Sequence, residues 1–440
     1  MSSAPVSVGI CGLGTVGRGT LQVLTRNASE IARRVGREIQ VVQIASRSDR
    51  GRPEGSGIGF TQDVFEVARN PKVDVLVEVI GGIETAHALV LEAIRNGKHV
   101  VTANKALIAV HGNQLFAAAR AMGVTIAFEA SVAGGVPVIK AIREGLAGNR
   151  IERIAGIING TSNFILTAMD QKGADFSSTL AEAQRLGYAE ADPTFDIGGI
   201  DAAHKLTILS SIAFGVPLRF DAVHTEGIAG VTAEDIEYAR QLGYRVKHLG
   251  ITRRRADGIE LRVHPTLVPI DHLLANVSGV MNAVLVHSDA VGATLYYGPG
   301  AGAEPTASAV VADIIDVARV LGANGAGHVP PLAFQAESVA AIPIVPIADT
   351  EAGYYLRIPA LDRPGVLAQI ARILSEEGIS IEAVIQKEQA IRKDDGETWV
   401  PVVILTQRVR ERNIDRAVAG IQELPDIRGS ITRLRVETLR

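Results

Sequence analysis

Residues 189–205, AEADPTFDIGGIDAAHK, combine four carboxylates and one lysine with small and apolar residues. The charged residues are Glu190, Asp192, Asp196, Asp201 and Lys205. The core-like segment LTILSSIAFG follows directly, so the charge adjoins a part of the chain that should be buried. Carboxylates in such a place can receive a substrate amine, and the lysine can transfer a proton beside a reacting oxygen.

Asp201 and Lys205 are four residues apart in a predicted helix over 200–214, so they share one face. The same face continues with three apolar residues: Ile208, Leu209 and Ile212. An exposed pair at this spacing would stabilise the helix by only about 0.2–0.5 kcal/mol and would continue into polar residues. The apolar continuation instead indicates a buried lysine, a candidate for proton transfer.

A second lysine, Lys105, follows a predicted buried strand in VVTANKAL. Ligands of open α/β sheets bind beyond the carboxyl ends of the strands, where Gly81 and Thr102 also lie. Lys105 is therefore either an exposed lysine whose stem covers apolar surface or a cation at a cofactor cleft.

The motif GICGLGTVGRG places three glycines between a strand pattern and a helix pattern. Gly12 permits a tight turn, Gly14 admits backbone amides to a pyrophosphate, and Gly17 allows close packing of helix on strand. The alternative is an ordinary glycine-rich turn, but the strand–turn–helix setting favours a dinucleotide site. The expected cofactor contacts are Gly12, Leu13, Gly14, Thr15, Val16 and Gly17.

The second predicted strand ends in ASRSDR, without the acid that usually holds the ribose hydroxyls of NAD at this point. Arg47 can pair with a 2′-phosphate, which favours NADP. In the alternative, Arg47 is solvated and Asp49 binds the ribose. Together with the lysines and acids, this predicts an NAD(P)-dependent oxidoreductase acting on a small amino-bearing substrate.

The strand and helix patterns predict three domains and a linker. Residues 1–135 alternate apolar runs at 6–12, 39–46, 73–81, 99–104 and 125–131 with helices, as in a Rossmann-type doubly wound parallel sheet. Residues 136–325 mix helices and strands, which indicates an α+β substrate-binding and dimerisation domain whose last helix returns to the first domain. Residues 326–350 resemble a linker, and 351–440 follow the β-α-β-β-α-β order of a ferredoxin-like domain.

Composition indicates a globular protein, with 47% hydrophobic residues, 21% charged residues and a net charge of -4. We expect no nucleic-acid partner, because no basic surface is indicated, and no membrane span. The single cysteine, Cys11, excludes an internal disulfide and a cysteine-rich zinc site. With no signal peptide recognisable, a cytoplasmic location is expected.

Six motifs in order make the resemblance to a known family specific: GLGTVGRG, VVTANKALIA, FEASVAGGVPVI, INGTSNFIL, AEADPTFDIGGIDAAHK and GPGAGAEPTASAVVAD. Along its whole length the chain resembles homoserine dehydrogenases with a C-terminal regulatory ACT domain. The resemblance implies reversible NAD(P)-linked interconversion of L-homoserine and L-aspartate 4-semialdehyde, in threonine, methionine and isoleucine biosynthesis. It also implies a homodimer or homotetramer, and no kinase domain is expected ahead of the glycine loop.

The resemblance also implies residue roles. Lys205 matches the proton-transfer lysine and Lys105 a second lysine at the nicotinamide, although which of them carries the proton stays open. Glu190 and Asp201 match the substrate-binding acids, with Asp196 nearby. Gly187 and Gly302 match glycines that contact the cofactor, and Gly187 is also expected at the substrate. A monovalent cation such as Na⁺ is expected to be bound by the main-chain oxygens of Glu129, Val132, Gly134 and Val136.

The segment IPALDRPGVLAQIARIL resembles the signature turn of ACT domains. Pro364 suits a first helical position, and Gly365 leaves room for a ligand at the helix start. Asp362 and Gly365 are therefore the expected effector contacts, with L-threonine the first effector to test. The alternative is a dimerisation module without a ligand.

Two other functions remain as alternatives. A phosphorylating semialdehyde dehydrogenase needs a thiol nucleophile, but Cys11, the one thiol, lies in a predicted core strand. A non-catalytic amino-acid sensor would not need both lysines and the acid cluster.

Overall fold

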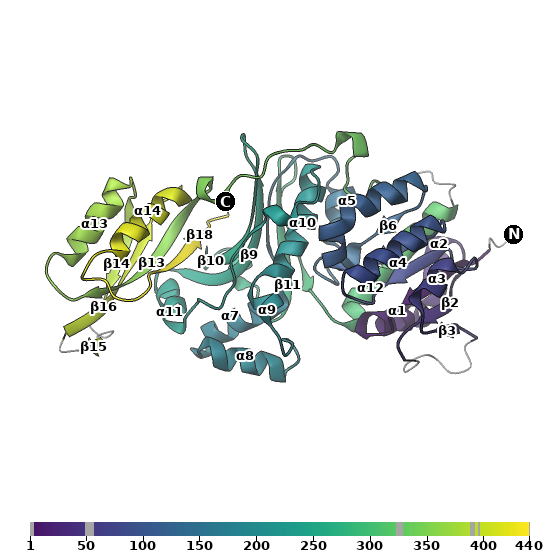
Figure 1. The fold of residues 1–440 in the computed structure, drawn as a ribbon, viewed down its shortest axis with the longest axis horizontal. Coiled ribbons are helices and arrows are strands. Elements are labelled where there is room, and N and C mark those ends of the chain that lie inside the picture. The colour runs from purple at the N-terminus through teal and green to yellow at the C-terminus, as the bar shows by residue number, and fades with distance from the viewer. Residues whose placement is uncertain (1–3, 49–56, 323–328, 388–391, 395–396, 440) are drawn as a thin grey trace. The chain divides into compact units, whose positions relative to one another are not determined.

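The computed structural model describes residues 4–48, 57–322, 329–387, 392–394 and 397–439 (Figure 1). These residues form two compact units that do not follow the order of the chain. The first unit comprises Met1–Gly160, Asp201–Val223 and Val280–Ile342. The second comprises Thr161–Ile200, His224–Gly279 and Pro343–Arg440.

The first unit contains a six-stranded, wholly parallel sheet in the order β3-β2-β1-β4-β5-β6. Its strands are β1 Val6–Cys11, β2 Ile39–Ala45, β3 Gly59–Thr61, β4 Val75–Glu78, β5 His99–Thr102 and β6 Ile126–Ala127. The expected Rossmann-type sheet is thus confirmed. β3 was not predicted, because three residues reading GFT give no periodic signal. β4 is shorter than predicted: it ends at Glu78, before Gly81 and Gly82 turn with positive φ.

The helices joining these strands are α1 Thr15–Arg26, α2 Ala28–Val35, α3 Val64–Arg69, α4 Glu84–Arg95 and α5 Lys105–Ala121. A later helix, α12 Ala303–Gly322, packs against α1 (Figure 1). A Cβ added to Gly19 of α1 would lie 2.5 Å from the Ala303 oxygen, so the two helices approach closely there. The buried face of α12, with Val310 and Ile314, joins the core beneath β1 and β4.

Three antiparallel strands also belong to the first unit, in the order β12-β11-β7. They are β7 Ile151–Ile157, β11 Met281–Ser288 and β12 Gly292–Pro299. The predicted helix over 200–214 forms as α10 Ile200–Phe214, and every residue from Asp201 onward is buried. The motif GPGAGAEPTASAVVAD covers the end of β12, which continues to Pro299, and the start of α12 at Ala303.

The second unit joins a helical layer to one mixed sheet in the order β9-β10-β18-β13-β16-β14. Its helices before residue 343 are α7 Gly160–Lys172, α8 Phe176–Arg185, α9 Thr194–Ile197 and α11 Ala233–Gln241. Its strands there are β8 His224–Thr225, β9 Tyr244–Arg254 and β10 Ile259–Pro269. The chain after 350 supplies β13 Glu351–Leu361, α13 Val366–Glu376, β14 Ile381–Gln386, β15 Arg392–Asp394, β16 Glu397–Thr406, β17 Val409–Arg410, α14 Glu411–Gln422 and β18 Thr432–Val436.

The C-terminal region has the predicted β-α-β-β-α-β order, with β15 and β17 as short additions. Its strand β18 pairs in parallel with β10, so the sheet continues across the two parts of the second unit. Arg435 of β18 is buried there and donates to Glu226 at 2.8 Å and to Glu411 at 2.9 Å. A buried charge is costly unless paired, so this arginine binds β18 firmly to the segment after β8.

The described part of the expected linker, 329–350, contains only the short 3-10 helices η5 Ala336–Ser338 and η6 Ile347–Asp349. It is held against the first unit where Phe334 packs on Gly215, and within the second where Val345 donates to Ile259. Residues 326–328 of that linker lie outside the described residues. A helix of sufficient length and hydrophobicity to cross a membrane is absent from the described residues.

Candidate active site

A cluster of opposite charges lies at the start of α10, with Asp201 and Lys205 buried and the Lys105 side chain 34% exposed. The Asp201 carboxylate accepts a hydrogen bond from Lys205 Nζ at 2.7 Å and forms an ion pair with Lys105 Nζ at 3.1 Å. Asn159 donates to the same carboxylate at 2.8 Å. Asp201 is only 3% exposed and Lys205 only 9%, as the apolar continuation of their helix face predicts. The two predicted catalytic lysines therefore share one carboxylate.

The end of β7 positions this cluster from a second side. Lys205 Nζ also donates to the carbonyl of Ile158 at 2.7 Å, and Asn159 follows directly in the chain. Asn159 stands in the motif INGTSNFIL but was not predicted as a site residue. A buried asparagine next to a glycine after an apolar strand is the signal that could have identified it.

Electrostatics keep Asp201 ionised despite its burial. Burial alone would raise its pKa, but Lys205, Lys105 and the hydrogen bonds it accepts outweigh burial and hold the pKa well below its ordinary value. Burial lowers the pKa of the neighbouring His204 to about 4, so this ring is neutral at pH 7. The cluster thus carries two lysines against one carboxylate and suits a group that develops negative charge.

A buried glutamate that the sequence did not reveal fixes the strand ends before Lys105. Glu78, at the end of β4, accepts hydrogen bonds from Thr102 Oγ1 at 2.6 Å and from the Ile80 amide at 3.0 Å. Burial raises the pKa of Glu78, and these hydrogen bonds oppose that shift. Because the Thr102 side chain is used in this way, its expected cofactor contact stays a prediction.

Asn104 sets the start of α5 and so the place of Lys105. Its side chain accepts from the Leu107 amide at 3.1 Å, capping the helix, and donates to the Gly82 carbonyl at 2.6 Å. Asparagine before a helical pattern is an N-cap signal, so the sequence could have indicated this residue. Gly81 lies in the same loop, in a left-handed conformation with open space beside its Cα.

The glycine loop has the geometry that its motif predicts. Gly12 has φ of 104°, and a Cβ there would lie 2.5 Å from the Val79 carbonyl oxygen. A Cβ on Gly17 would lie 2.0 Å from the Gly12 oxygen, whereas Gly14 faces open space. Gly14 also ends the loop without a side-chain cap, so the first amides of α1 are available to a phosphate. The residues present therefore fit a dinucleotide pyrophosphate.

Arg47 lies two residues beyond the end of β2 and is exposed. Its carbonyl accepts a hydrogen bond from Gln62 at 3.4 Å, which holds its backbone beside the segment after β3. The alternative ribose ligand, Asp49, lies outside the described residues.

The other predicted substrate residues belong to the second unit. Glu190 and Asp196 lie before and within α9, and Gly187 lies beyond the end of α8 with φ of 75°. The Glu190 carbonyl accepts from Gln184 at 3.1 Å, and the Asp196 carbonyl accepts from Ser162 at 3.2 Å. These hydrogen bonds involve main-chain oxygens and say nothing about the two side chains. The expected substrate-binding roles of both carboxylates therefore stay predictions. Asp192 accepts a hydrogen bond from the Thr194 amide at 3.1 Å and so helps to start α9.

The expected cation loop packs against the turn before α12. Ala133 and Gly134 have φ of 53° and 47°, and a Cβ on Gly134 would lie 2.5 Å from the Gly300 oxygen. The buried side-chain amide of Asn282 touches Gly300, and neither of its polar atoms has a partner among the described residues. An orphaned buried amide beside a loop of turned carbonyls is compatible with an oxygen-ligated cation, although the Val136 carbonyl already accepts from Val138 at 2.7 Å.

The Glu129 side chain serves the protein rather than a metal. It accepts from the amides of Ile139 and Lys140 at 2.9 and 2.8 Å, and burial raises its pKa to about 7. Within the described ranges, three or more His, Cys, Asp or Glu side chains nowhere gather as a metal site. A cation here would therefore depend on main-chain oxygens, as Glu129, Val132, Gly134 and Val136 were predicted to supply.

The predicted effector turn precedes α13. Gly365 is the N-cap with φ of 98° and has open space beside its Cα, while Asp362 is exposed and lies 3.5 Å from Gln386 Nε2. Pro364 precedes the cap, so its predicted place at the first helical position is wrong. The reason is that Gly365 in the left-handed region breaks the helical path before Val366.

The sequence comparisons identify the family to which the chain is similar. The family model described as homoserine dehydrogenase matches residues 137–315, and the model of its NAD-binding domain matches 12–129. An ACT domain model matches 354–408. A homoserine dehydrogenase of Pseudomonas aeruginosa is 61% identical over 435 residues, which are 99% of each chain. The chain belongs to the homoserine dehydrogenase family.

Solved structures of this family have the same fold. A homoserine dehydrogenase from Thiobacillus denitrificans is 57% identical and superposes with a TM-score of 0.94 over 99% of each chain. A hyperthermophilic archaeal homoserine dehydrogenase, solved in complex with NADPH, is 30% identical with a TM-score of 0.62. That match covers 71% of this chain and 98% of the archaeal one.

The buried cluster predicts how Asp201→Asn will behave. The substitution keeps the side chain's shape but removes the only negative charge in the cluster, so the free energy of unfolding should fall by about 3 kcal/mol in urea unfolding at pH 7. Because the folded-state pKa is depressed, the stabilisation is present above the unfolded pKa of about 3.9 and is lost as pH falls below it. The loss should therefore be equal at pH 6 and pH 8.

Asp221→Asn is the matched control in the same unit. Asp221 pairs with Arg219 at the surface, where such a pair contributes at most about 1 kcal/mol. If Asp201→Asn were no less stable than this control, the carboxylate would not be the charge that balances the lysines.

Proposed function

We propose that the protein catalyses the reversible, NAD(P)-linked interconversion of L-aspartate 4-semialdehyde and L-homoserine, in the biosynthesis of threonine, methionine and isoleucine. The observation that carries the proposal is the pair of lysines held on one buried carboxylate, Lys105 at 3.1 Å and Lys205 at 2.7 Å from Asp201. Membership of the homoserine dehydrogenase family supports it. A cytoplasmic homodimer or homotetramer is part of the same proposal.

The chain's residues supply charge and a proton at the aldehyde oxygen. The nicotinamide, when bound, supplies the hydride that reduces the aldehyde carbon. Lys205 stabilises the negative charge that develops on the oxygen and gives it a proton, and in the reverse direction it takes the proton back. Lys105 adds a second positive charge beside the nicotinamide, which matches its place directly after β5 and Asn104.

Asp201 has a positioning role in this proposal. Its oxygens are engaged by two lysines and Asn159, so it fixes the lysines where charge develops. Glu190 and Asp196 then bind the substrate amine. The sequence-based prediction that Asp201 also binds the amine can be tested, because an amine ligand changed to asparagine raises KM, whereas loss of positioning lowers kcat.

The alternative of a phosphorylating semialdehyde dehydrogenase, which needs a thiol nucleophile, finds no support at Cys11. Cys11 ends β1 fully buried, and burial, with Glu78 and Asp63, raises the pKa of its thiol. A protonated, inaccessible thiol is a poor nucleophile. The amino-acid sensor alternative is separated from the enzyme by an assay of cofactor oxidation with the semialdehyde.

Replacing Lys205 tests the central step. Lys205→Met should lower kcat by about 10²-fold or more, the usual effect of losing a positioned acid or base, in a spectrophotometric assay with the semialdehyde and NADPH. Lys172→Met is the control, because Lys172 is exposed and pairs with Glu182 on the surface. Near-normal turnover in a folded Lys205→Met protein would show that another group carries the proton.

NADP is the proposed cofactor. The contacts are the glycine loop from Gly12 to Gly17 together with Gly81, Thr102, Gly187 and Gly302. The archaeal relative's NADPH complex supports a nicotinamide cofactor. A monovalent cation such as Na⁺, held by main-chain oxygens of Glu129, Val132, Gly134 and Val136, completes the site, since hard cations prefer oxygen ligands.

Arg47 decides between the two cofactors. Arg47→Ala should raise KM for NADPH by roughly 10-fold, the loss of about 1.4 kcal/mol for a charged hydrogen bond to the 2′-phosphate. KM for NADH should stay almost unchanged in the same steady-state assay. An equal rise for both cofactors would mean that Arg47 does not contact the phosphate.

We also propose that the ACT domain binds an amino acid, L-threonine first, and inhibits the enzyme through the turn at Asp362 and Gly365. Removing residues after 350 would expose β10 and leave Arg262 without Glu437, so the test uses the full chain. Asp362→Ala should abolish threonine inhibition and leave basal kcat unchanged. Asp415→Ala, an exposed acid of α14 paired with Arg433, is the control. If threonine neither binds nor inhibits the native enzyme, the domain is a structural module.

A further inference from the structure

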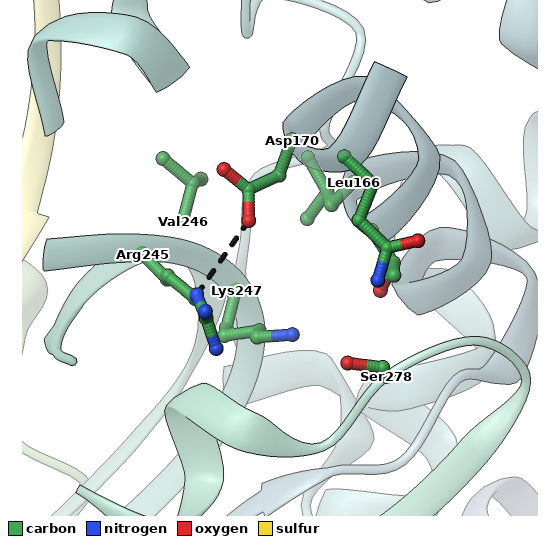
Figure 2. Close-up of a pocket in the computed structure, with 8 residues that line it drawn as sticks. Leu166, Asp170, Arg245, Val246, Lys247 and Ser278 are labelled. Atoms are coloured by element: carbon green, nitrogen blue, oxygen red, sulfur yellow. Dashed lines mark ion pairs between the residues drawn. The ribbon is translucent and has the colours of Figure 1, made fainter. Parts of the chain in front are cut away.

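A small polar pocket lies in the second unit, and none of its lining residues is proposed for catalysis. It has a volume of about 90 Å³ and lies between α7 and β9, next to the segment after the 3-10 helix η4 Leu273–Asn276. Thr167 and Asp170 line it from α7, Arg245 and Lys247 from β9, and Ser278 closes one side (Figure 2). The space accommodates several water molecules, and so a ligand of a few heavy atoms.

Lys247 is the unusual member of this pocket because its charge is buried without a carboxylate. It is 3% exposed, and its ammonium group donates to the Val277 carbonyl at 2.6 Å and to Asn163 Oδ1 at 3.4 Å. Among the described residues it forms no ion pair. Burial, and then the positive charge of Arg245, lower its pKa to about 8. At pH 7 the group is therefore still largely a cation, and neutral oxygens alone hydrogen-bond to it.

The charges around the pocket leave an excess of positive charge. Asp170 is the one acid in the lining, and it is shared between Arg245 at 3.5 Å and Arg240 at 3.8 Å. Arg240 does not line the pocket and also pairs with Glu237 at 2.5 Å, so within the lining two cations, Arg245 and Lys247, face one carboxylate. Figure 2 shows the Arg245–Asp170 pair at one side of the pocket and the ammonium of Lys247 directed toward Ser278 at the other. A buried cation gains most from a ligand that brings the missing negative charge.

The hydrogen-bonding groups that line the pocket also favour a negatively charged ligand. The ammonium of Lys247 and the hydroxyls of Ser278 and Thr167 can donate to oxygen atoms, and Arg245 adds a guanidinium. A metal cation would be repelled by the net charge, and an apolar ligand would leave these donors unsatisfied. We propose that the pocket binds a small oxyanion, either a phosphate group or a carboxylate, with Lys247 as its principal contact.

The bound anion would join three segments that carry the helical layer of the second unit. Lys247 lies on β9, Thr167 on α7 accepts from the Gly279 amide at 3.3 Å, and Ser278 stands between them in the loop. A ligand that contacts all three stabilises the folded state by mass action. Because the readout is binding and unfolding temperature, the inference does not depend on the proposed enzymatic activity.

The test titrates the full chain at pH 7 with inorganic phosphate or with acetate, in calorimetry and in thermal unfolding, at an ionic strength held constant with chloride. We expect millimolar or tighter binding and a rise in Tm with one of the two anions. Phosphate alone binding identifies a phosphoryl ligand, and acetate alone identifies a carboxylate. Lys247→Met should weaken that binding at least 10-fold, whereas Lys172→Met, on the exposed side of α7, should retain it.

Two results would overturn the proposal. One is the absence of heat and of any Tm increase, with both anions, beyond the chloride control. The other is unchanged affinity in Lys247→Met. If that variant does not fold, Ser278→Ala and Arg245→Gln replace it, and retention of full affinity in both would equally refute an oxyanion site in this pocket.

Discussion

The buried carboxylate of Asp201 is the constraint on which the candidate active site depends. Two lysine ammonium groups cannot be brought together in a region of low dielectric unless a counter-charge lies between them. Asp201 provides that charge with its own hydrogen bonds satisfied by Lys205 and Asn159. These contacts offset the free-energy cost of burying the carboxylate. Two lysines balanced by one carboxylate leave one positive charge, which can stabilise an oxygen that becomes negative. Stability and reactivity therefore arise from one charge balance.

The scaffold around this charge balance is fixed by contacts at the carboxyl ends of the parallel strands. Glu78 joins the ends of β4 and β5 through Thr102, and Asn104 caps α5 so that Lys105 follows immediately. The glycine loop needs the absence of Cβ atoms at Gly12 and Gly17 and open space at Gly14. Each of these contacts is local to the carboxyl edge of a parallel sheet, where ligands of this fold class bind.

In the second unit, buried arginines form the ion pairs that join distant segments, as Asp201 does in the first unit. Arg435 joins β18 to Glu226 and Glu411, and Arg262 of β10 reaches Glu437 at 2.5 Å. These pairs make the ACT strands continuous with the β9–β10 hairpin rather than an appended domain. Lys247 differs from these arginines because its buried charge has no carboxylate partner among the described residues. For that reason its pocket is the candidate site for an anion.

The sequence by itself determined the parallel sheet, the helix carrying Asp201 and Lys205, the glycine loop and the β-α-β-β-α-β order, because each is encoded in local periodicity and turn chemistry. It also indicated that the lysine face of that helix is apolar. The return of the last helix of residues 136–325 to the first domain was also predicted. Only the tertiary structure decided that Lys105 and Lys205 share one carboxylate, and that Asn159 and Glu78 support them. These residues lie far apart in the chain, so their contacts depend on strand order and on which charges must be buried together. Local sequence patterns therefore do not predict which of these charged residues pair.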